Sequence, residues 1–269
     1  MEPPASTKKE ALQGVFTRAA SGYGAIRYFP PLGQWLVDVA QISSGARVLD
    51  VACGRGAVLF PAAEKVGPLG QVVGVDLSEG MVGATLADLH QRGLTQAQVH
   101  QMDAERLLFP DSAFDHVLCG FSLQFFPGLD RALSEFRRVL KPAGQVAVTT
   151  WGDEDSRWGW YDDLLVAYQA VVKLGSQTLD KREELFDWFS RAGFANTQII
   201  TKDIDTFYAD EEEWWATKWS ISGRAGLEQL ESNRLERLKA EVFGRMQALK
   251  EADGFHDRLQ VHLTLAIKP

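Results

Sequence analysis

A glycine-rich segment near residue 50 follows a short apolar stretch and could bind a ligand through its backbone. Residues 47–51 predict a buried strand, which leads through the turn Asp50-Val51-Ala52-Cys53-Gly54-Arg55-Gly56 into a helix predicted over 57–66. Glycines in such a turn let a ligand approach the backbone, and the first amides of the helix face it. Taken alone, the pattern also fits an ordinary strand-to-helix turn.

A second acid makes this turn a candidate nucleoside site. Asp76 lies 20 residues after Gly56, at the end of a strand predicted over 71–76. A carboxylate there can accept from both hydroxyls of a ribose, whereas the alternative is an acid that favours the start of the next helix. Leu59 stands where a dinucleotide motif has its third glycine, so NAD is the less favoured cofactor. The sequence contains no P-loop motif, and 120–124 does not match the nucleophile elbow.

The elements around these residues alternate between strands and helices. Strands are predicted over 47–51, 71–76, 98–102, 113–120 and 145–150, and helices over 33–42, 57–66, 78–92 and 130–140, the third of these capped by Ser78. This order predicts an α/β fold with a parallel sheet covered on both faces. Ligands of such sheets bind beyond the carboxyl ends of the strands, here just after Val51, Val75, Met102 and Cys119.

The second part of the chain is predicted to be largely helical. Helices are expected over 159–173, 181–192, 211–218 and 234–251, with strands over 197–207 and 258–267. Because no linker or repeat interrupts the chain, we expect a single domain over 1–269, with a core at 33–150. Residues 151–195 and 208–255 are expected to be helical insertions that cap a substrate.

Composition excludes several classes of protein. The chain has 269 residues, a net charge of −8 and no apolar run long enough to span a membrane, so we expect neither a nucleic-acid nor a membrane partner. Two cysteines without a ligand-spaced histidine predict neither disulfides nor a metal. The first ten residues lack the apolar region of a signal peptide, which predicts a frayed terminus and a cytoplasmic location. Oligomerisation cannot be read from the sequence.

Together these motifs resemble those of the class I S-adenosylmethionine (SAM)-dependent methyltransferases, especially the branch of ubiquinone/menaquinone and small-molecule natural-product methyltransferases. The resemblance covers about residues 12–150. It rests on five motifs in order, namely 50–56, Asp76, Met102-Asp103-Ala104-Glu105, Cys119-Gly120-Phe121-Ser122 and Leu140-Lys141-Pro142-Ala143-Gly144. The resemblance implies a Rossmann-like sheet of seven strands in the order 3-2-1-4-5-7-6, with the seventh antiparallel and a helical lid.

The resemblance also implies roles for individual residues. The methionine end of SAM would lie against the first turn and the segment after the fourth strand, at Asp50, Ala52, Cys53, Gly54, Gly56, Gly120, Phe121 and Ser122. Ala52 replaces the usual first glycine of the family. Asp76 would bind the ribose. The adenine would lie between Leu77 and Met81, with Asp103 accepting from its amino group and the Ala104 amide facing a ring nitrogen.

The N-terminal region resembles the segment that folds over SAM in relatives. Phe16 and Tyr23 match its Phe-x-x-x-Ala-x-x-Tyr pattern, so residues 12–30 would form a lid in which Tyr23 touches cofactor or substrate, or packs as a staple. Weaker candidates for substrate or lid contacts are Gln124, Trp151 and Trp219. Relatives often have histidine where Gln124 stands, so no base is assigned, and each of the five histidines is better explained by packing.

The predicted activity is methyl transfer from SAM to O, N or C of a small apolar or aromatic metabolite, in secondary or quinone-like metabolism. The products are the methylated metabolite and S-adenosylhomocysteine (SAH). A macromolecule methyltransferase is disfavoured by the missing basic surface and by the lack of an Asn/Asp-Pro-Pro-Tyr motif. A catalytically silent subunit, or a cyclase that retains SAM, is the remaining alternative.

Overall fold

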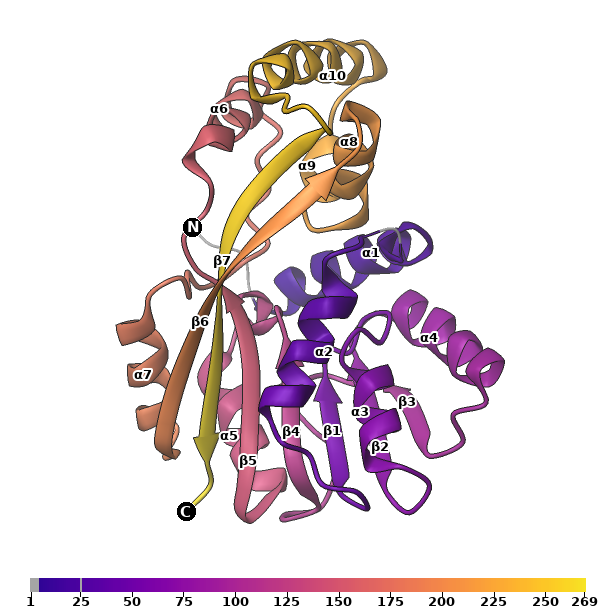
Figure 1. Ribbon diagram of the computed structural model, residues 1–269, viewed down its shortest axis with the longest axis vertical. Coiled ribbons are helices and arrows are strands. Elements are labelled where there is room, and N and C mark those ends of the chain that lie inside the picture. Colours follow the sequence, from indigo (N-terminus) through magenta and orange to yellow (C-terminus); the bar gives the residue numbers. More distant parts are fainter. Residues whose placement is uncertain (1–4, 25) are drawn as a thin grey trace.

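The computed structural model describes residues 5–24 and 26–269 (Figure 1). One sheet contains all seven strands in the order β3-β2-β1-β4-β5-β7-β6. The first five strands are parallel, and β7 is antiparallel to both of its neighbours. The predicted sheet order is therefore confirmed. The strands are β1 (Arg47–Val51), β2 (Gln71–Asp76), β3 (Ala97–Gln101), β4 (Phe114–Gly120), β5 (Leu140–Trp151), β6 (Ala195–Tyr208) and β7 (Phe255–Ile267).

Helices cover both faces of this sheet. The helices are α1 (Ala5–Tyr23), α2 (Phe29–Val39), α3 (Leu59–Val66), α4 (Glu79–Arg92), α5 (Leu129–Val139), α6 (Trp160–Ala167), α7 (Arg182–Arg191), α8 (Glu211–Ser220), α9 (Arg224–Leu227) and α10 (Ser232–Met246). Apolar side chains of α2, α3 and α4 form the core on one face, and those of α5 and α7 form it on the other. Each helix packs through one apolar face. In α5, for example, Leu129, Leu133 and Phe136 recur at helical spacing and are buried.

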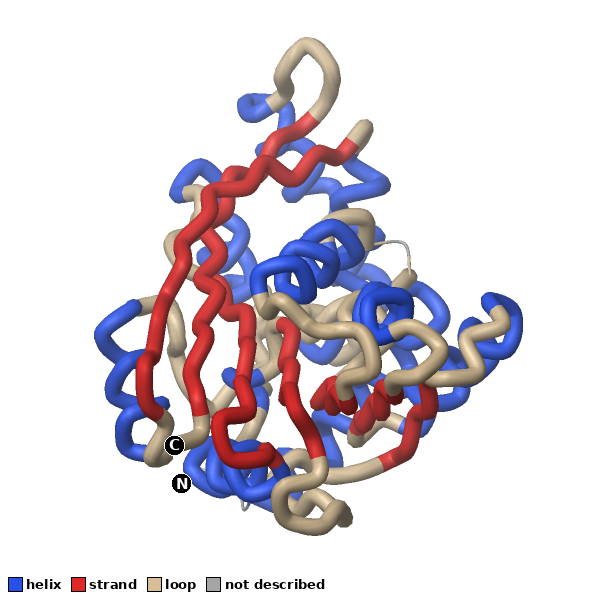
Figure 2. Tube along the Cα trace, turned by 60° about the horizontal axis from the view of Figure 1, so that its bottom comes forward, coloured by secondary structure: helices blue, strands red, loops and turns tan. Residues whose placement is uncertain are grey.

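A cap lies beyond the carboxyl ends of the parallel strands. Strands β6 and β7 continue past the rest of the sheet as a two-stranded ribbon, and α6, α8, α9 and α10 surround its far end (Figure 1). Figure 2 shows this ribbon passing without a break from sheet to cap. Burial of Trp158, Trp214, Leu238 and Phe255 gives the cap a core of its own. The cap therefore needs the sheet for its strands but not for its apolar packing.

Several predicted boundaries need correction. Helix α2 begins at Phe29 rather than at residue 33, because Pro30 and Pro31 fit its first turn, where their missing amides cost nothing. The expected division between a lid at 12–30 and a core from 33 thus falls inside one helix. Helix α7 packs on the sheet with α5, so residues 182–191 do not belong to the first cap segment. Strand β5 begins at Leu140 rather than at residue 145, so the motif at 140–144 lies within the strand, where its pairing with β4 is irregular.

The start of the chain also differs from expectation. A frayed terminus was predicted for residues 1–10; the first four lie outside the described residues, but α1 is helical from Ala5. Leu12, Val15 and Ala19 of α1 are buried, so tertiary packing holds the helix in place. None of the helices that the structure describes is both long and apolar enough to cross a membrane.

Candidate functional site

The turn after β1 is held in its shape by contacts with the end of β2. The Cys53 amide donates to the Val75 carbonyl over 3.0 Å, and the Gly54 amide donates to Asp76 Oδ2 over 2.8 Å. Ala52 has a φ of 54°, in the left-handed region that glycine tolerates best. This explains why the family pattern has glycine there: Ala52 fills the same conformation at some cost in strain.

Asp76 joins two backbone segments at the carboxyl end of β2. Besides accepting from Gly54, it accepts from the Ser78 amide over 2.9 Å through its other oxygen. Burial raises the pKa of Asp76, and the two amides oppose that effect. Each carboxylate oxygen has a second lone pair. Asp76 is therefore ordered by the fold and still able to accept from ligand hydroxyls.

Asp50 lies fully buried at the end of β1 with an unsatisfied carboxylate. Neither of its oxygens has a hydrogen-bond partner among the described residues. Burial raises the pKa of Asp50 well above its ordinary value, the nearby charge of Asp76 adds to the rise, and the nearby backbone amide of Leu59 opposes it in part. Leaving a buried carboxylate unpaired costs free energy, so a cationic or donating group of a ligand would suit this position.

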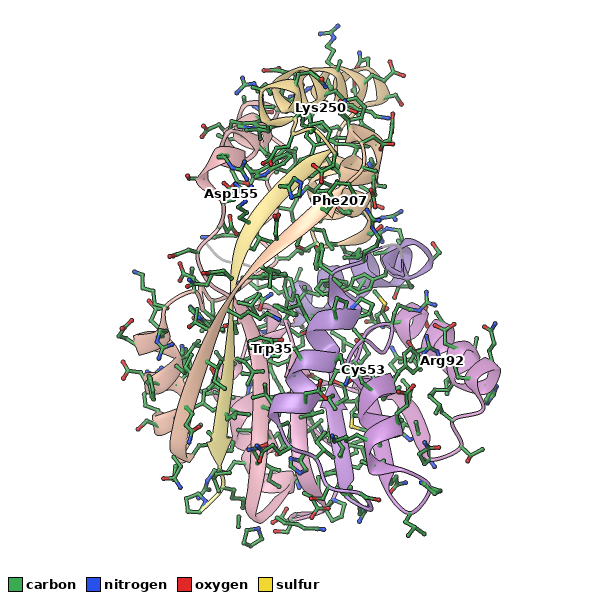
Figure 3. All side chains as sticks on the ribbon, in the orientation of Figure 1. Trp35, Cys53, Arg92, Asp155, Phe207 and Lys250 are labelled. Carbon is green, nitrogen blue, oxygen red and sulfur yellow. The ribbon has the colours of Figure 1, made fainter. Side chains whose placement is uncertain are left out.

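Two adjoining cavities contain all the residues predicted to bind SAM. The first-turn cavity, of about 460 Å³, is lined by Asp50, Ala52, Cys53, Gly54, Gly56, Gly120, Phe121 and Ser122. The α1 cavity, of about 100 Å³, is lined by Asp76, Leu77, Met81, Asp103, Ala104 and part of α1, and also by Ala52, Gly54, Phe121 and Ser122. Residues after four strands thus converge, as the sheet predicts. Figure 3 labels Cys53, which lines the first-turn cavity in the core, and Asp155, which lies in the cap.

Helix α1 contributes a residue that the sequence did not reveal. Lys9 Nζ lies 2.6 Å from Asp103 Oδ2 and 3.0 Å from Glu105 Oε2, at the rim of the α1 cavity. Asp103 is 94 positions away in the sequence. A single lysine near the N-terminus gives no local signal of such a contact, because only the packing of α1 across the core creates it.

A third cavity, the cap cavity of about 460 Å³, lies between the core and the cap. Its core end is aromatic: Tyr23 stacks on Phe29 at 5.3 Å between ring centroids, and Phe121 stacks on Trp151 at 4.3 Å. Tyr23 and Phe121 line all three cavities. These two rings therefore stand where the cap cavity meets the pair of cavities below it.

The weaker sequence candidates have mixed outcomes. Phe16, Gln124 and Trp151 line the cap cavity with Tyr23. The amide of Gln124 donates to the Phe121 carbonyl over 2.8 Å, so it supports a backbone turn in which Phe121 has a φ of 55°. Trp219 lines none of these cavities, because it packs in the cap core beside Arg224. Its helix presents Trp214 to the cavity instead.

No histidine lines the three cavities, although all five lie in the described part of the chain. The buried tyrosines do not replace them as bases: burial raises the pKa of Tyr23, with the charge of Asp76 adding to it, and burial also raises that of Tyr28. Both phenols stay protonated at neutral pH. Within residues 5–24 and 26–269, no group of three or more histidines, cysteines or acids is arranged to hold a metal ion.

Helix α1 connects the core to the cap above these cavities. On the core side, Thr17 Oγ1 lies 3.0 Å from Ser78 Oγ, and Arg55 donates to the Ala20 carbonyl over 2.8 Å. On the cap side, Arg18 pairs with Glu228 over 2.6 Å. The helix therefore covers the α1 cavity and part of the cap cavity while contacting both halves of the molecule.

Comparisons with known proteins agree with this geometry. Residues 48–144 match the family model described as a methyltransferase domain. Nocamycin O-methyltransferase of Saccharothrix syringae is 33% identical over 247 residues, which cover 85% of this chain and 88% of that protein. Demethylmenaquinone methyltransferase of Geobacillus kaustophilus is 30% identical over 72% of this chain and 92% of its own length. The chain belongs to the class I SAM-dependent methyltransferases.

A solved structure shows the same fold. The YcgJ protein of Bacillus subtilis has a TM-score of 0.63 and 21% sequence identity, covering 88% of this chain and 98% of that one. The enzyme class and its use of SAM are thus established by family membership, and the fold by the sheet order and this likeness.

Proposed function

We propose that the enzyme transfers the methyl group of SAM to an acidic or electron-rich O, N or C atom of a small apolar or aromatic metabolite held in the cap cavity. The observation that carries the proposal is the meeting of the three cavities at Tyr23 and Phe121. A cofactor in the two lower cavities and an acceptor in the upper one would approach each other at these rings.

The residues present fit SAM. The unsatisfied carboxylate of Asp50 suits the ammonium of its amino-acid end, and Gly54 and Gly56 of the first turn line the same cavity. Asp76 would accept from the ribose hydroxyls, and Asp103 from the adenine amino group. When bound, SAM supplies a methyl group already activated on a sulfonium.

The cavities themselves supply orientation and dryness. Holding two reactants in line can lower the activation barrier by roughly 7–11 kcal/mol. No nucleophilic side chain is therefore required. The aromatic core end of the cap cavity has no histidine, and the phenols of Tyr23 and Tyr28 are held neutral, so this end favours acceptors that ionise readily or are electron-rich. Phenols, enols and activated carbons meet this requirement.

The aromatic core end of the cap cavity supports an acceptor with a flat apolar body. Rings at offset-stacked and edge-to-face geometries, such as those of Phe29, Phe121 and Trp151, suit aromatic ligands. One relative is named for O-methylation and another acts on demethylmenaquinone. A role in secondary or quinone-like metabolism is consistent with both.

The activity is tested by incubating the protein with SAM and a panel of phenols, enols and hydroquinones. We expect SAH to form in proportion to acceptor and the acceptor to gain the mass of one methyl group. SAM binding without SAH formation above the acceptor-free control, for every member of the panel, would contradict the proposed acceptor class.

The cofactor assignment is tested separately by calorimetry with SAH. Asp103→Ala and Asp76→Asn should each weaken binding, because hydrogen bonds to charged groups contribute about 1.5–3 kcal/mol. Asp38→Ala, an exposed acid on α2, serves as the control and should bind SAH normally. Unchanged affinity in both site variants would exclude the two assigned roles.

A further inference from the structure

The cap end of the cap cavity differs from its aromatic core end because it contains buried polar groups. Asp257 on β7, Tyr161 on α6 and Trp214 on α8 all line it. Asp257 Oδ1, the Tyr161 hydroxyl and Trp214 Nε1 are buried, and none has a hydrogen-bond partner among the described residues. Asp257 is 9% exposed and Trp214 is 1% exposed.

Lys218 brings a positive charge to the same end. Its Nζ lies 4.1 Å from the centroid of the Trp214 ring and 5.5 Å from that of Tyr161. It forms no ion pair with any carboxylate of the described chain. Burial lowers the pKa of Lys218, and the nearby charges of Asp257, Glu154 and Asp162 oppose that effect. Lys218 and Asp257 thus line the same cavity and interact electrostatically without forming an ion pair.

Asp155, another acid of this lining, already has hydrogen-bond partners. Asp155 accepts from Arg157 over 2.6 Å and from the Arg258 amide over 3.1 Å. Asp155 therefore differs from Asp257, Tyr161 and Trp214, whose unsatisfied atoms belong to residues of the same lining. A buried polar group without a partner destabilises the protein, and a bound polar group would remove that cost.

We propose that the acceptor carries, at the end remote from its methylated atom, a neutral group that both donates and accepts, such as a hydroxyl, enol or amide, which donates to Asp257 and accepts from Lys218 or the Trp214 indole. This inference rests on the proposed function, because it deepens the description of the same acceptor. Beside the ammonium of Lys218 a cationic group would be repelled, and the acids Asp257, Glu154 and Asp162 would repel an anionic one. A neutral group avoids both repulsions and satisfies the orphaned atoms.

The experiment compares matched probes that differ by one remote hydroxyl. Binding of 1-naphthol and 1,5-dihydroxynaphthalene, and of 4-phenylphenol and 4,4′-biphenol, is measured by calorimetry with the full chain saturated with SAH. In the wild type we expect at least one diol to bind about tenfold more tightly than its partner, since a tenfold difference corresponds to one hydrogen bond to a charged group.

Two variants locate the effect. Asp257→Leu and Lys218→Met remove the charge and keep most of the side-chain volume, so each should reduce the diol advantage to about twofold or less while 1-naphthol binds as before. Because Asp257→Leu changes a buried strand residue, Lys218→Met keeps the test decisive if that variant does not fold. Asp163→Leu, the same exchange at an exposed position of α6, is the control and should retain the advantage.

The outcomes separate this inference from the proposed function. If the mono-hydroxy probes bind but neither diol binds more tightly, water alone fills the cap end, and this inference fails while the proposed function stands. An advantage that persists in both variants also overturns it. If none of the four probes binds the SAH complex, the proposed class of aromatic acceptors fails, and the proposed remote polar group fails with it.

Discussion

At the scale of single residues, the site combines groups that the fold has satisfied with groups that it has left unsatisfied. Asp76 is fixed by two backbone amides, and Asp103 by Lys9. Asp50 and Asp257 are buried with oxygens that have no partner in the described chain. Unsatisfied buried groups are rare in folded proteins and are concentrated where ligands bind. Their positions, at the bottom of the first-turn cavity and at the top of the cap cavity, mark two ends of one binding region.

The buried acid in the cap should make stability depend on pH. Burial raises the pKa of Asp257 from 3.8 to about 6, with Asp155 and Glu154 adding to the rise and Lys218 and Arg157 opposing it. Between these two pH values the folded state retains a proton that the unfolded state releases, so the free energy of unfolding falls as pH rises through this window. Above about pH 6 the whole cost is present.

Asp257→Asn should remove this dependence. We expect the variant to gain up to about 3 kcal/mol at pH 7 relative to the wild type, and to show no such gain near pH 3.5, where Asp257 is protonated in both states. Urea unfolding measured from pH 3.5 to 8 for both proteins provides the comparison. A difference in stability that stays constant across this range would show that Asp257 is not a buried, titrating carboxyl.

At the scale of elements, α2 shows how closely the helices approach the first turn. A Cβ added at Gly33 would lie 2.0 Å from the Ala57 carbonyl oxygen, which is backbone and cannot move aside. By contrast, a Cβ added at Gly83 of α4 would have no neighbouring atom within 4 Å. Both glycines lie inside helices, but only Gly33 lies where a side chain would clash with neighbouring backbone.

Alanine at these two positions should have opposite effects. Gly33→Ala forces α2 away from the turn and should cost about 1–3 kcal/mol, with weaker SAH binding because the turn moves. Gly83→Ala should instead stabilise the protein by about 0.5–1 kcal/mol through helix propensity. Chemical denaturation of both variants measures the effect. Equal stability changes of one sign would rule out the close approach of α2.

The contacts of helix α1 with the cap and with the core can be tested separately. Its cap-side pair, Arg18 with Glu228, is partly exposed and contributes about 0–1 kcal/mol to stability. We expect Arg18→Ala to lower methyl transfer severalfold with little change in SAH affinity, because it loosens the cover over the reacting atoms. Lys9→Met should instead alter SAH affinity, since Lys9 contacts Asp103.

Turnover and the SAH dissociation constant, measured for both variants, distinguish the two ends of α1. The Lys9 variant controls for a general effect of disturbing the helix. If Arg18→Ala retains full turnover, the contact with the cap does not hold the cover in place. If both variants change affinity and turnover in proportion, α1 acts as a wall of the cofactor site alone.

At the scale of the whole molecule, strand β7 makes core and cap interdependent. Its second half, from Val261 to Ile267, pairs with both β5 and β6, whereas its first half, from Phe255 to Gln260, pairs with β6 alone. The cap core packs around that first half. Neither part can lose its share of β7 without exposing backbone hydrogen-bonding groups of the other.

The molecule should therefore unfold in one step. Five of the eight tryptophans, Trp158, Trp160, Trp214, Trp215 and Trp219, belong to the cap, so tryptophan fluorescence reports mainly on the cap and far-ultraviolet circular dichroism on the whole chain. Both midpoints should coincide, and SAH at about 100 times its dissociation constant should raise them together by the equivalent of about 2.7 kcal/mol. An earlier fluorescence transition that SAH does not shift would show a cap that melts independently.

The sequence by itself determined the elements whose signals are local. The alternation of strands and helices follows from periodicity, the N-cap of α4 at Ser78 follows from helix capping, and the acids at the ends of β1 and β2 follow from turn chemistry. The sheet order and the residues that line the first-turn and α1 cavities followed from the family motifs in that framework. Neighbouring residues carry these signals, so they can be read without knowing the rest of the fold.

Only the tertiary structure decided which distant residues meet. The packing of α1 brings Lys9 to Asp103, the sheet takes α7 away from the cap, and the β6–β7 ribbon carries Asp257 to the same cavity as Lys218. Each of these contacts depends on long-range packing that no periodicity within a single segment encodes. The residues that line the two cavities at the strand ends could therefore be named from the sequence, whereas the lining of the cap cavity, built between the core and a cap folded over it, could not.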